Sequence, residues 1–246
     1  MTDTPADDFK IDLRSDVTVE LVKSAATDSD VLFAARVSTA GEQSLDELKK
    51  DPERSKGLIN YLMRDRHGSP FEHNSMTFFI SAPIFVFREF MRHRVGWSYN
   101  EESGRYRELQ PVFYVPDTSR KLVQQGRPGK YVFVEGTAEQ HGLVSRAMED
   151  SYRQAYGTYQ EMLAAGVARE VARAVLPVGL YSSMYATCNA RSLMHFLGLR
   201  TQHELAKVPS FPQREIEMVG EKMEEEWARL MPLTHAAFNA NGRVAP

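Results

Sequence analysis

The sequence has a single cysteine, Cys188, which excludes an intramolecular disulfide. Such sparing use of cysteine is typical of proteins in a reducing cytoplasm, so we expect a cytoplasmic location. No apolar run reaches the about 18 residues that span a bilayer, and the acidic N-terminal segment lacks the apolar core of a signal peptide. We therefore expect no membrane partner.

The sequence also lacks an excess of basic residues. Its 30 Lys and Arg residues are balanced by 33 Asp and Glu residues, giving a formal net charge of −3. A surface that wraps nucleic acid needs a basic excess, so we expect no nucleic-acid partner. The glycine pattern G-x-G-x-x-G is absent as well, which argues against a Rossmann dinucleotide site. Anion binding would therefore depend on local groups of arginines.

The length of 246 residues, with 42% hydrophobic and 26% charged residues, is typical of one globular domain. We expect that domain to cover residues 1–246, with mobile ends at 1–14 and 239–246. Alternation predicts strands at residues 17–21, 76–80, 112–115 and 180–187, and a short edge strand at 131–134 within a surface excursion from 119 to 136. Helical spacing and caps predict helices from residues 28, 52, 83, 137, 167, 189 and 216, the one from 83 ending at Arg92–Arg94.

One stretch, residues 92–106, is much richer in polar groups than its neighbours and reads RHRVGWSYNEESGRY. Guanidinium, hydroxyl and amide groups are costly to bury without partners, yet apolar segments flank this stretch on both sides. A polar loop between buried elements is a usual place for a binding site. The mixture suits a pocket for an anionic, heteroaromatic small molecule, although a solvated salt-bridge face or a subunit contact would have the same composition.

The sequence offers little support for a metal site or for a cysteine nucleophile. His67, His73 and His93 are potential zinc ligands, but their spacing matches no common zinc motif, so we predict no metal site. Cys188 follows a predicted strand and has no neighbouring group that would activate a thiolate. We interpret it as a small buried residue rather than a nucleophile.

The polar stretch resembles the signature of the flavin-dependent thymidylate synthases (the ThyX family), an R-H-R followed by S-x-N-E-x-S-x-R-Y. Four further segments are similar to family motifs: A-A-R-V-S ending at Ser38, H-x-[ST]-P-x-E-H at His67–His73, A-R-x-V-L-P at Ala172–Pro177, and N-x-R-S-L-x-[NH]-F-x-x-x-R at Asn189–Arg200. The sequence departs from the signature at one place, because eight residues (Val95–Glu102) separate R-H-R from the last serine where the family usually has seven.

The resemblance implies an α+β fold of the ThyX type, a single domain in which a mixed or antiparallel sheet packs with long helices and no Rossmann unit is present. It also implies a homotetramer whose active sites are shared between subunits.

The resemblance further implies roles for individual residues. Arg200 is implied as the catalytic residue, whose fixed charge stabilises an anionic pyrimidine. The implied cofactor-binding residues are Ser38, Ser69, Glu72, Arg92, His93, Arg94, Glu101, Asn189, Ala190, Arg191 and His195. The implied substrate-binding residues are Glu89, Phe90, Met91, Arg92, Glu101, Glu102, Ser103, Gly104, Arg105, Arg173 and Arg200.

These roles imply a thymidylate synthase that methylates dUMP to dTMP. The implied cofactor is FAD, reduced by NADPH, and the implied carbon donor is methylenetetrahydrofolate, since no side chain supplies hydride. Two alternatives stay open at this point. One is a nucleotide-binding or RNA-binding module without catalysis, and the other is a flavin-dependent methylase that acts on a larger uridine-containing substrate.

Overall fold

The computed structural model describes residues 9–40, 52–128 and 130–246. The chain divides into two compact units, each built from three separate segments. The first unit consists of the residues up to Asp16, Ser81–Arg88 and Glu101–Ser183, and the second of Val17–Ile80, Glu89–Asn100 and Met184–Pro246. The single domain over residues 1–246 stays a prediction. Residues 1–8 of the predicted mobile N-terminal end lie outside the described residues.

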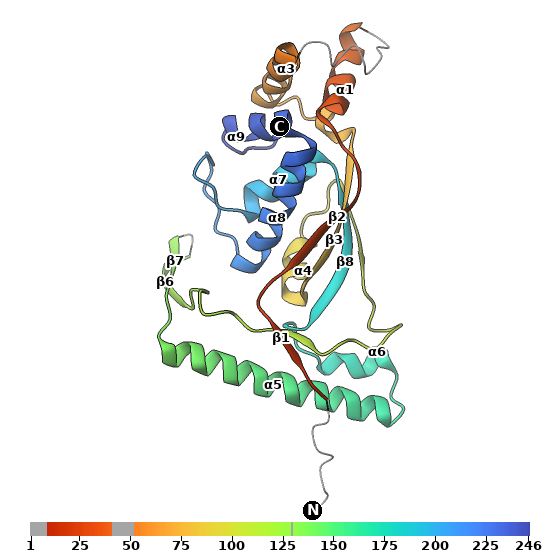
Figure 1. Ribbon diagram of the computed structural model, residues 1–246, viewed down its shortest axis with the longest axis vertical. Coiled ribbons are helices and arrows are strands. Elements are labelled where there is room, and N and C mark those ends of the chain that lie inside the picture. Colours follow the sequence, from red (N-terminus) through yellow and green to blue (C-terminus); the bar gives the residue numbers. More distant parts are fainter. Residues whose placement is uncertain (1–8, 41–51, 129) are drawn as a thin grey trace, which may run out of the picture. The chain divides into compact units, whose positions relative to one another are not determined.

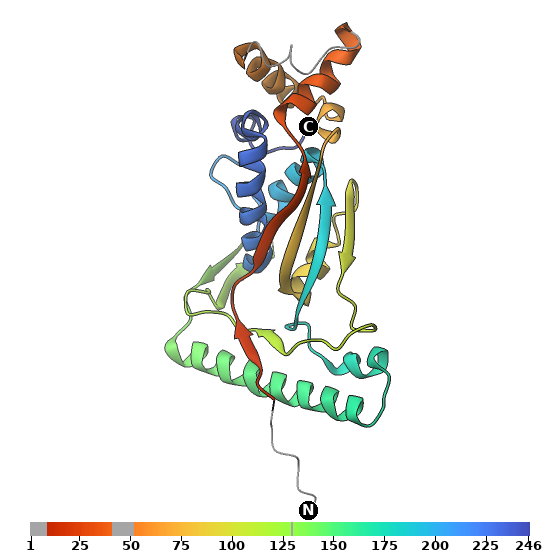
Figure 2. The same ribbon diagram turned by 45° about the vertical axis from the view of Figure 1, so that its right-hand side comes forward.

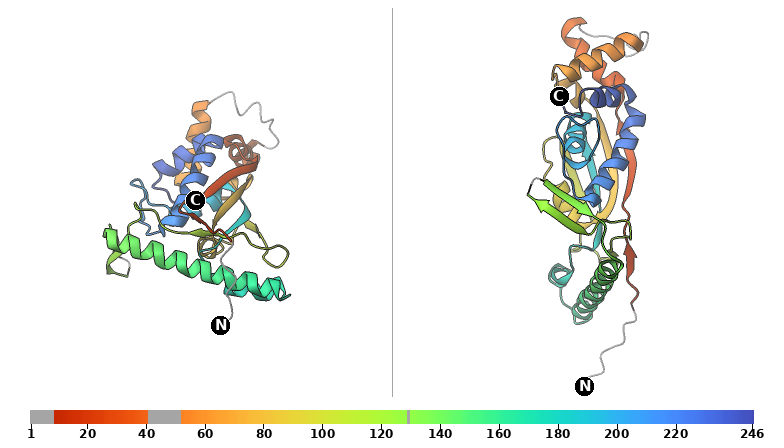
Figure 3. Two further views of the ribbon diagram at one scale, coloured as in Figure 1. Left: turned by 60° about the horizontal axis from the view of Figure 1, so that its bottom comes forward. Right: turned by 90° about the vertical axis from the view of Figure 1, so that its left-hand side faces the viewer.

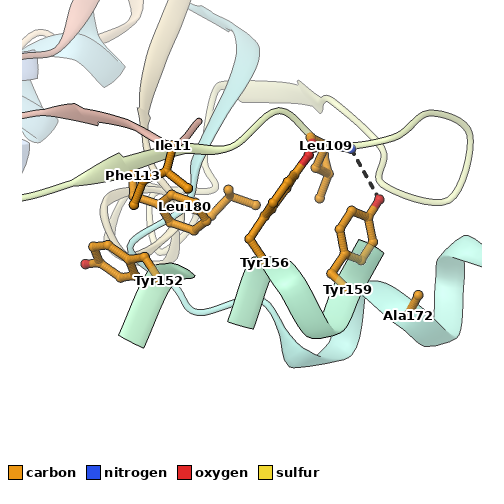
Figure 4. Close-up of a cluster of buried hydrophobic side chains, with 8 residues drawn as sticks. All are labelled: Ile11, Leu109, Phe113, Tyr152, Tyr156, Tyr159, Ala172 and Leu180. Atoms are coloured by element: carbon orange, nitrogen blue, oxygen red, sulfur yellow. Dashed lines mark hydrogen bonds between the residues drawn. The ribbon is translucent and has the colours of Figure 1, made fainter. Parts of the chain in front are cut away.

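The first unit is organised around one long helix, α5 (Ala138–Ala164) (Figure 1). Thr137 opens this helix with a reciprocal capping box to Gln140, as the sequence predicts, and Gly166 with φ +82° follows its end. The buried face of α5 carries three tyrosines. Figure 4 shows them in a cluster of buried side chains: Ile11, Leu109, Phe113, Tyr152, Tyr156, Tyr159, Ala172 and Leu180.

The tyrosine hydroxyls hydrogen-bond α5 to the backbone of residues 109–114. Tyr152 donates to the carbonyl oxygen of Tyr114 (2.8 Å), and Tyr156 donates to that of Leu109 (3.1 Å). The Tyr159 hydroxyl accepts from the backbone N–H of Leu109 (3.3 Å), which is the dashed bond in Figure 4. The rings thus fill the core while their polar ends are paired, as buried tyrosines require.

Strands of the first unit lie at its N-terminal segment and in a hairpin. β1 (Asp12–Arg14) pairs in parallel with β5 (Val112–Tyr114), so the prediction of a mobile end is wrong for the residues that form β1. β6 (Val123–Arg127) and β7 (Lys130–Val134) form an antiparallel hairpin, visible in Figure 3. The sequence predicted β7 but not its partner strand. α6 (Arg169–Ala172) and the 3₁₀ turn η2 (Arg173–Val175) complete this unit.

The second unit contains most of a four-stranded sheet with the order β2-β3-β8-β4 (Figure 2). These strands are β2 (Thr18–Ala25), β3 (Ser75–Pro83), β8 (Tyr181–Cys188) and β4 (Trp97–Glu101). The first three confirm predicted strands. β4 corrects the prediction of a simple loop over residues 92–106, because a third of that stretch pairs as an edge strand.

The helices of the second unit are α1 (Asp28–Ala40), α3 (Pro52–Arg64), the 3₁₀ turn η1 (Ser69–Glu72), α7 (Ala190–Arg200), α8 (Arg214–Leu230) and α9 (Pro232–Ala240). α8 confirms the helix predicted from residue 216 and buries Ile216, Val219, Met223 and Trp227 on one face. α9 was not predicted. None of the described helices is long and apolar enough to cross a membrane.

The residues after α9 correct a second prediction. We expected residues 239–246 to be mobile, yet Arg243 is 3% exposed and Ala245 6% exposed. The backbone N–H of Arg243 bonds to the carbonyl oxygen of Phe238 (2.9 Å), and the Arg66 guanidinium donates to that of Ala245 (2.7 Å). This segment is packed because polar side chains elsewhere in the unit satisfy its backbone.

The helix that leads to R-H-R is shorter than predicted. α4 (Ile84–Phe90) ends at Phe90, and residues 91–92 form a turn. The prediction that this helix ends at Arg92–Arg94 is therefore wrong, and Arg92 and His93 do not share a helix with Arg88 and Glu89. The consequence is that Arg92, His93 and Arg94 belong to a connection between α4 and β4.

Candidate functional site

The first unit contains a cavity of about 110 Å³ at the second half of the polar stretch. It brings together four of the predicted site residues, Glu101, Glu102, Gly104 and Arg173. Its other lining residues are Ile84, Leu109, Leu176, Leu180 and Ser182. An apolar floor with carboxylate, hydroxyl and guanidinium groups at one side is the usual composition of a small-molecule pocket.

Gly104 is buried, and its backbone passes very close to two side chains of the pocket. A Cβ at this position would lie 2.8 Å from Leu109 Cδ1 and 3.1 Å from Arg173 Cδ. Glycine is therefore required by space. It lets the backbone pass close to both side chains at the edge of the cavity.

The two carboxylates of the pocket have different environments. Burial raises the pKa of Glu101, and the charge of Glu102 raises it further. The Ser182 hydroxyl and the charge of Arg173 act in the opposite direction. Glu102 accepts from Arg107 Nε at 3.1 Å and from the Ser183 hydroxyl at 3.4 Å. Glu102 is thus held by the protein, whereas Glu101 remains poised to hydrogen-bond a ligand.

Ser103 and Arg105 lie beside the pocket but do not line it. The Ser103 hydroxyl accepts from the backbone N–H of Arg105 (3.3 Å). The Arg105 side chain is 54% exposed and pairs with Glu170 of α6 at 2.9 Å. The structure therefore does not bring Arg105 into the cavity lining with Arg173, and a role in phosphate binding would require it to leave Glu170.

The second unit gathers another group of predicted residues at the C-terminal end of α7. Arg200 Nε donates to His93 Nε2 (3.1 Å), and the same guanidinium pairs with the Glu89 carboxylate. The Arg200 side chain is 16% exposed, so this cation is held in a largely desolvated place. Its charge and orientation are fixed before any ligand arrives.

His93 is neutral in this arrangement. Burial lowers its pKa to about 4, with further lowering by the charges of Arg200 and His195. Since Arg200 always carries its protons, His93 Nε2 must accept, and the hydrogen bond assigns the ring proton to Nδ1. A charged His93 would have no lone pair at Nε2 and would repel Arg200.

The turn that carries R-H-R is fixed by aromatic residues. The Tyr99 hydroxyl donates to the carbonyl oxygen of His93 (2.7 Å), and the His93 ring packs on Phe196 of α7 at 4.9 Å between centroids. The Phe90 ring also packs on the Phe196 ring, at 4.5 Å between centroids. Phe90 is buried, so it shapes the turn from inside, while Met91 is on the surface.

The connection between R-H-R and β4 turns sharply at Gly96. Gly96 has φ +71°, and a Cβ there would lie 2.1 Å from the Ser192 hydroxyl oxygen on α7. The same hydroxyl donates to the carbonyl oxygen of Val95 (3.0 Å). This connection therefore forms a left-handed turn against α7, which only glycine fits.

Arg92 and Arg94 are exposed on this turn. Within the described part of the chain, neither guanidinium has a hydrogen bond or an ion pair with another side chain. Two uncommitted arginines one residue apart are suited to the oxygens of a phosphate or diphosphate group.

The start of α7 holds a third group of predicted residues. The Asn189 side chain caps the helix by accepting from Ser192 N (2.8 Å), as predicted, and Ala190 is buried. Arg191 pairs with Glu72 of η1 at 2.5 Å and donates through Nε to an oxygen of Pro246 at 2.7 Å. Ser69 and His195 are exposed, and burial together with the charges of Arg191 and Arg66 lowers the pKa of His195.

Ser38 lies on α1, which packs against η1 and so against the turn that bears Ser69. Its hydroxyl donates to Ala35 O within the helix (3.0 Å). Cys188 is buried, and burial raises the pKa of its thiol, which is the opposite of activation. Among the described residues, no three His, Cys, Asp or Glu side chains gather as a metal site.

The second unit has a cavity of about 460 Å³ that is lined by residues of the segment 202–211. None of the predicted site residues lines it. Sequence reasoning also missed Ser182, although its inward register on the predicted strand could have indicated it. The packing of Glu224 and Arg243 behind Thr201 had no local signal, because these residues are far apart in the sequence.

Comparison with known proteins decides the family. Residues 20–233 match the family described as "Thymidylate synthase complementing protein". The chain is 94% identical over 246 residues to a flavin-dependent thymidylate synthase of Streptomyces coelicolor, covering all of both chains. The chain belongs to the flavin-dependent thymidylate synthase family. It is also 61% identical over 234 residues to the family member of Tropheryma whipplei strain TW08/27, covering 94% of this chain and 96% of that protein.

Solved structures agree with this family. A UMP/dUMP methylase, PolB from Streptomyces cacaoi, bound with 5-Br dUMP has a TM-score of 0.90 and 59% sequence identity, covering 96% of this chain and 100% of that one. The complex of PolB with 5-Br UMP has a TM-score of 0.88 and 58% identity, covering 96% and 99%. The expected α+β fold is thereby confirmed, and the chain is an enzyme of a thymidylate synthase family.

Proposed function

We propose that the protein forms dTMP by reductive methylation of dUMP, with FAD as cofactor, NADPH as reductant and methylenetetrahydrofolate as carbon donor. The observation that carries this proposal is the cavity in which Glu101, Glu102 and Gly104 of the family signature meet Arg173 of a separate motif. Family members of high identity support the reaction. The dUMP analogue bound to PolB supports the substrate.

In the first unit, we assign phosphate binding to Arg173, Ser103, the backbone at Gly104 and, once released from Glu170, Arg105. Each charge-assisted hydrogen bond of this kind contributes about 1.5–3 kcal/mol. Glu101 and Glu102 would accept hydrogen bonds from the sugar or the base, because a carboxylate repels phosphate.

In the second unit, we assign Arg200 as the catalytic residue and Glu89, Met91 and Arg92 as further substrate contacts. Phe90 is buried and would support these contacts from inside the turn. Methylation at a pyrimidine carbon requires electron density to build up in the ring. A guanidinium cannot lose its proton in this range of pH, so Arg200 would stabilise an anionic ring nitrogen without becoming neutral. Neutral His93 accepts from Arg200 without adding a second positive charge beside it.

The residues of the second unit fit a flavin dinucleotide. Exposed Arg92 and Arg94 have no side-chain partner in the described chain and are suited to its diphosphate. His93, Asn189, Arg191, His195, Ser38, Ser69 and Glu72 would supply the remaining polar contacts, and buried Ala190 would hold the start of α7 in place. Glu101, in the first unit, stays a predicted cofactor contact. When bound, FAD supplies the hydride that no side chain can donate.

A cavity of about 110 Å³ is smaller than the roughly 300–1,000 Å³ of typical small-molecule sites. It would hold part of a nucleotide. This supports a homotetramer with shared active sites, which we propose together with a cytoplasmic location. Light scattering of the eluting protein should give four times the 27.9 kDa of the chain, and a monomeric mass with full activity would exclude shared sites.

The test of the reaction uses the purified protein reconstituted with FAD. We expect a yellow protein whose flavin band disappears with NADPH and returns when dUMP and methylenetetrahydrofolate are added, with dTMP as product. A protein that binds dUMP but forms no dTMP would instead be a nucleotide-binding module. A colourless protein that takes up no FAD would reject the proposal.

A second candidate substrate is UMP, because the solved PolB complexes include one with 5-Br UMP. The same assay with dUMP, UMP and a uridine-containing tRNA separates the three. We expect the highest kcat/KM with dUMP. A higher kcat/KM with UMP or tRNA would assign the protein to a different methylase reaction.

A further inference from the structure

A buried charged network lies behind the C-terminal end of α7, in the second unit. Its centre is Arg243, whose side chain is 1% exposed. Gly242 (φ +76°) and Arg243 (φ +54°) are both left-handed, so the chain turns back after α9 and directs this side chain inward. A non-glycine residue in this conformation is costly and persists only when its surroundings hold it.

Every terminal N–H of the Arg243 guanidinium has an acceptor. Nη1 donates to Glu224 Oε1 (2.6 Å) and Asn239 Oδ1 (2.8 Å), and Nη2 donates to Glu224 Oε2 (2.7 Å) and Thr201 Oγ1 (3.1 Å). Glu224 also bonds to His235 at 2.8 Å. Burial favours the neutral form of Glu224, but the hydrogen bonds from Arg243 and His235 outweigh it and lower its pKa to about 2. Glu224 is therefore ionised and the pair is charged.

Thr201 connects this network to the proposed catalytic residue. It is the residue directly after Arg200, it caps α7, and it is 4% exposed. Its hydroxyl donates its only proton to Leu197 O (2.8 Å), so its bond with Arg243 is one in which it accepts. Its carbonyl oxygen accepts from the Ser210 hydroxyl at 2.5 Å.

Neighbouring backbone leaves this end of α7 little freedom to shift. A Cβ on Gly220 of α8 would lie 2.7 Å from Thr201 Cγ2, and one on Gly198 would lie 3.1 Å from the carbonyl oxygen of Arg243. The end of α7 is thus packed against α8 on one side and against the chain after α9 on the other. Close-packed surroundings of this kind transmit a displacement instead of absorbing it.

We propose that Arg243 is a positioning residue for Arg200. Through the hydroxyl of Thr201 it fixes the last turn of α7, so that Arg200 stays on His93 and Glu89. This inference rests on the proposed function, because it gives Arg243 a part in the same reaction. Arg243 touches neither substrate nor cofactor in this role.

Three variants test the proposal in the full-length protein with FAD. Thr201→Val removes the acceptor for Arg243 at nearly constant shape, Thr201→Ser restores the hydroxyl, and Arg243→Met removes the guanidinium. The matched control is Arg229→Met on α8, where the arginine is 66% exposed and pairs with Glu226. Thr201→Val keeps the test valid if Arg243→Met does not fold.

We expect Thr201→Val to lower kcat by up to about 100-fold, the scale of a small misplacement of a catalytic group. The dissociation constant of FAD should change less than about twofold, Thr201→Ser should recover most of the loss, and Arg229→Met should match the wild type. Combined with Arg200→Lys, Thr201→Val should have little further effect on kcat, because both changes act through one side chain.

The outcomes are distinct. Wild-type kcat in folded Thr201→Val would overturn the inference while leaving the proposed function intact. Thr201→Val is also compared in two backgrounds, the wild type and Arg200→Lys. If it lowers kcat by the same factor in both, the network has a structural role only. Absence of dTMP from the wild-type protein would overturn the proposed function, and the inference with it.

Discussion

The two regions that carry the signature residues are built in opposite ways. In the first unit, Glu101 and Arg173 face a cavity of about 110 Å³ and leave hydrogen-bonding capacity for a ligand. In the second unit, Arg200 is already bonded to His93 and Glu89. The difference separates two tasks. Recognition keeps polar groups open, whereas stabilising a developing charge needs a group that is oriented beforehand.

Burial shifts titration in both regions, with different consequences. It raises the pKa of the Glu101 carboxyl, which lies beside Ser182, Glu102 and Arg173. It lowers the pKa of His93 to about 4, which keeps that ring neutral and able to accept from Arg200. The same desolvation thus disfavours the charged form of both groups, which raises the pKa of the acid and lowers that of the base.

The largest expected effect comes from removing Arg200, the preoriented cation of the second unit. Arg200→Met should lower kcat for dTMP formation by about 100- to 1,000-fold, the cost of removing one preorganised charged donor. FAD should remain bound, because the family signature assigns other residues to it. Steady-state kinetics together with the flavin absorption band provide the measurement. Undiminished turnover would remove Arg200 from the mechanism.

The next effect concerns the turn that holds this region together. Gly96→Ala should lower the free energy of unfolding by about 1–3 kcal/mol or more, since φ +71° is strained for alanine and its Cβ would collide with Ser192. Denaturant unfolding measures this. Gly57→Ala is the matched control, because open space surrounds that helical position, and it should stabilise the protein by about 0.5–1 kcal/mol. Equal effects at both positions would contradict the turn geometry.

A pH experiment sharpens the comparison at His93. An unfolded histidine takes up its proton near pH 6.5, but folded His93 does so near pH 4. Between these values the unfolded chain binds more protons, so the free energy of unfolding should fall as the pH is lowered from about 6.5 to about 4. His93→Gln accepts from Arg200 at any pH and should show a shallower fall. Parallel stability curves for the two proteins would rule out this linkage.

The smallest expected effect on stability comes from the Arg105–Glu170 pair, which lies beside the cavity of the first unit. The exposed Arg105–Glu170 pair contributes at most about 1 kcal/mol, so Arg105→Met and Glu170→Gln should both leave the free energy of unfolding nearly unchanged. Their effects on dUMP should differ. Calorimetric titration should give weaker binding for Arg105→Met only, because Glu170→Gln frees Arg105 for phosphate. Equal affinities in the two variants would reject that role.

The elements with strong local signals were predictable. Tyr152, Tyr156 and Tyr159 recur at helical spacing on α5, and Thr137 and Asn189 cap their helices as such residues do. The motifs also led to Glu101, Glu102, Gly104 and Arg173, which line the cavity. In each of these cases the signal that predicts the element or residue lies within one helix or one motif.

What escaped prediction depends on partners distant in the sequence. α4 stops at Phe90, and the backbone beyond it bonds to the Tyr99 hydroxyl, which no helical pattern reveals. Arg105 pairs with Glu170, 65 positions away, instead of lining the cavity. The residues after α9 looked loose because they are short of apolar side chains, yet Arg243 anchors them on Glu224.

The most direct test of the central claim is a single turnover without oxygen. Protein with reduced FAD is mixed with dUMP and methylenetetrahydrofolate, and flavin absorption and dTMP are followed together. We predict that one dTMP appears for each flavin reoxidised, and that the amount falls with Arg173→Met and with Arg200→Met alike. Reoxidation of the flavin without any dTMP would contradict the account.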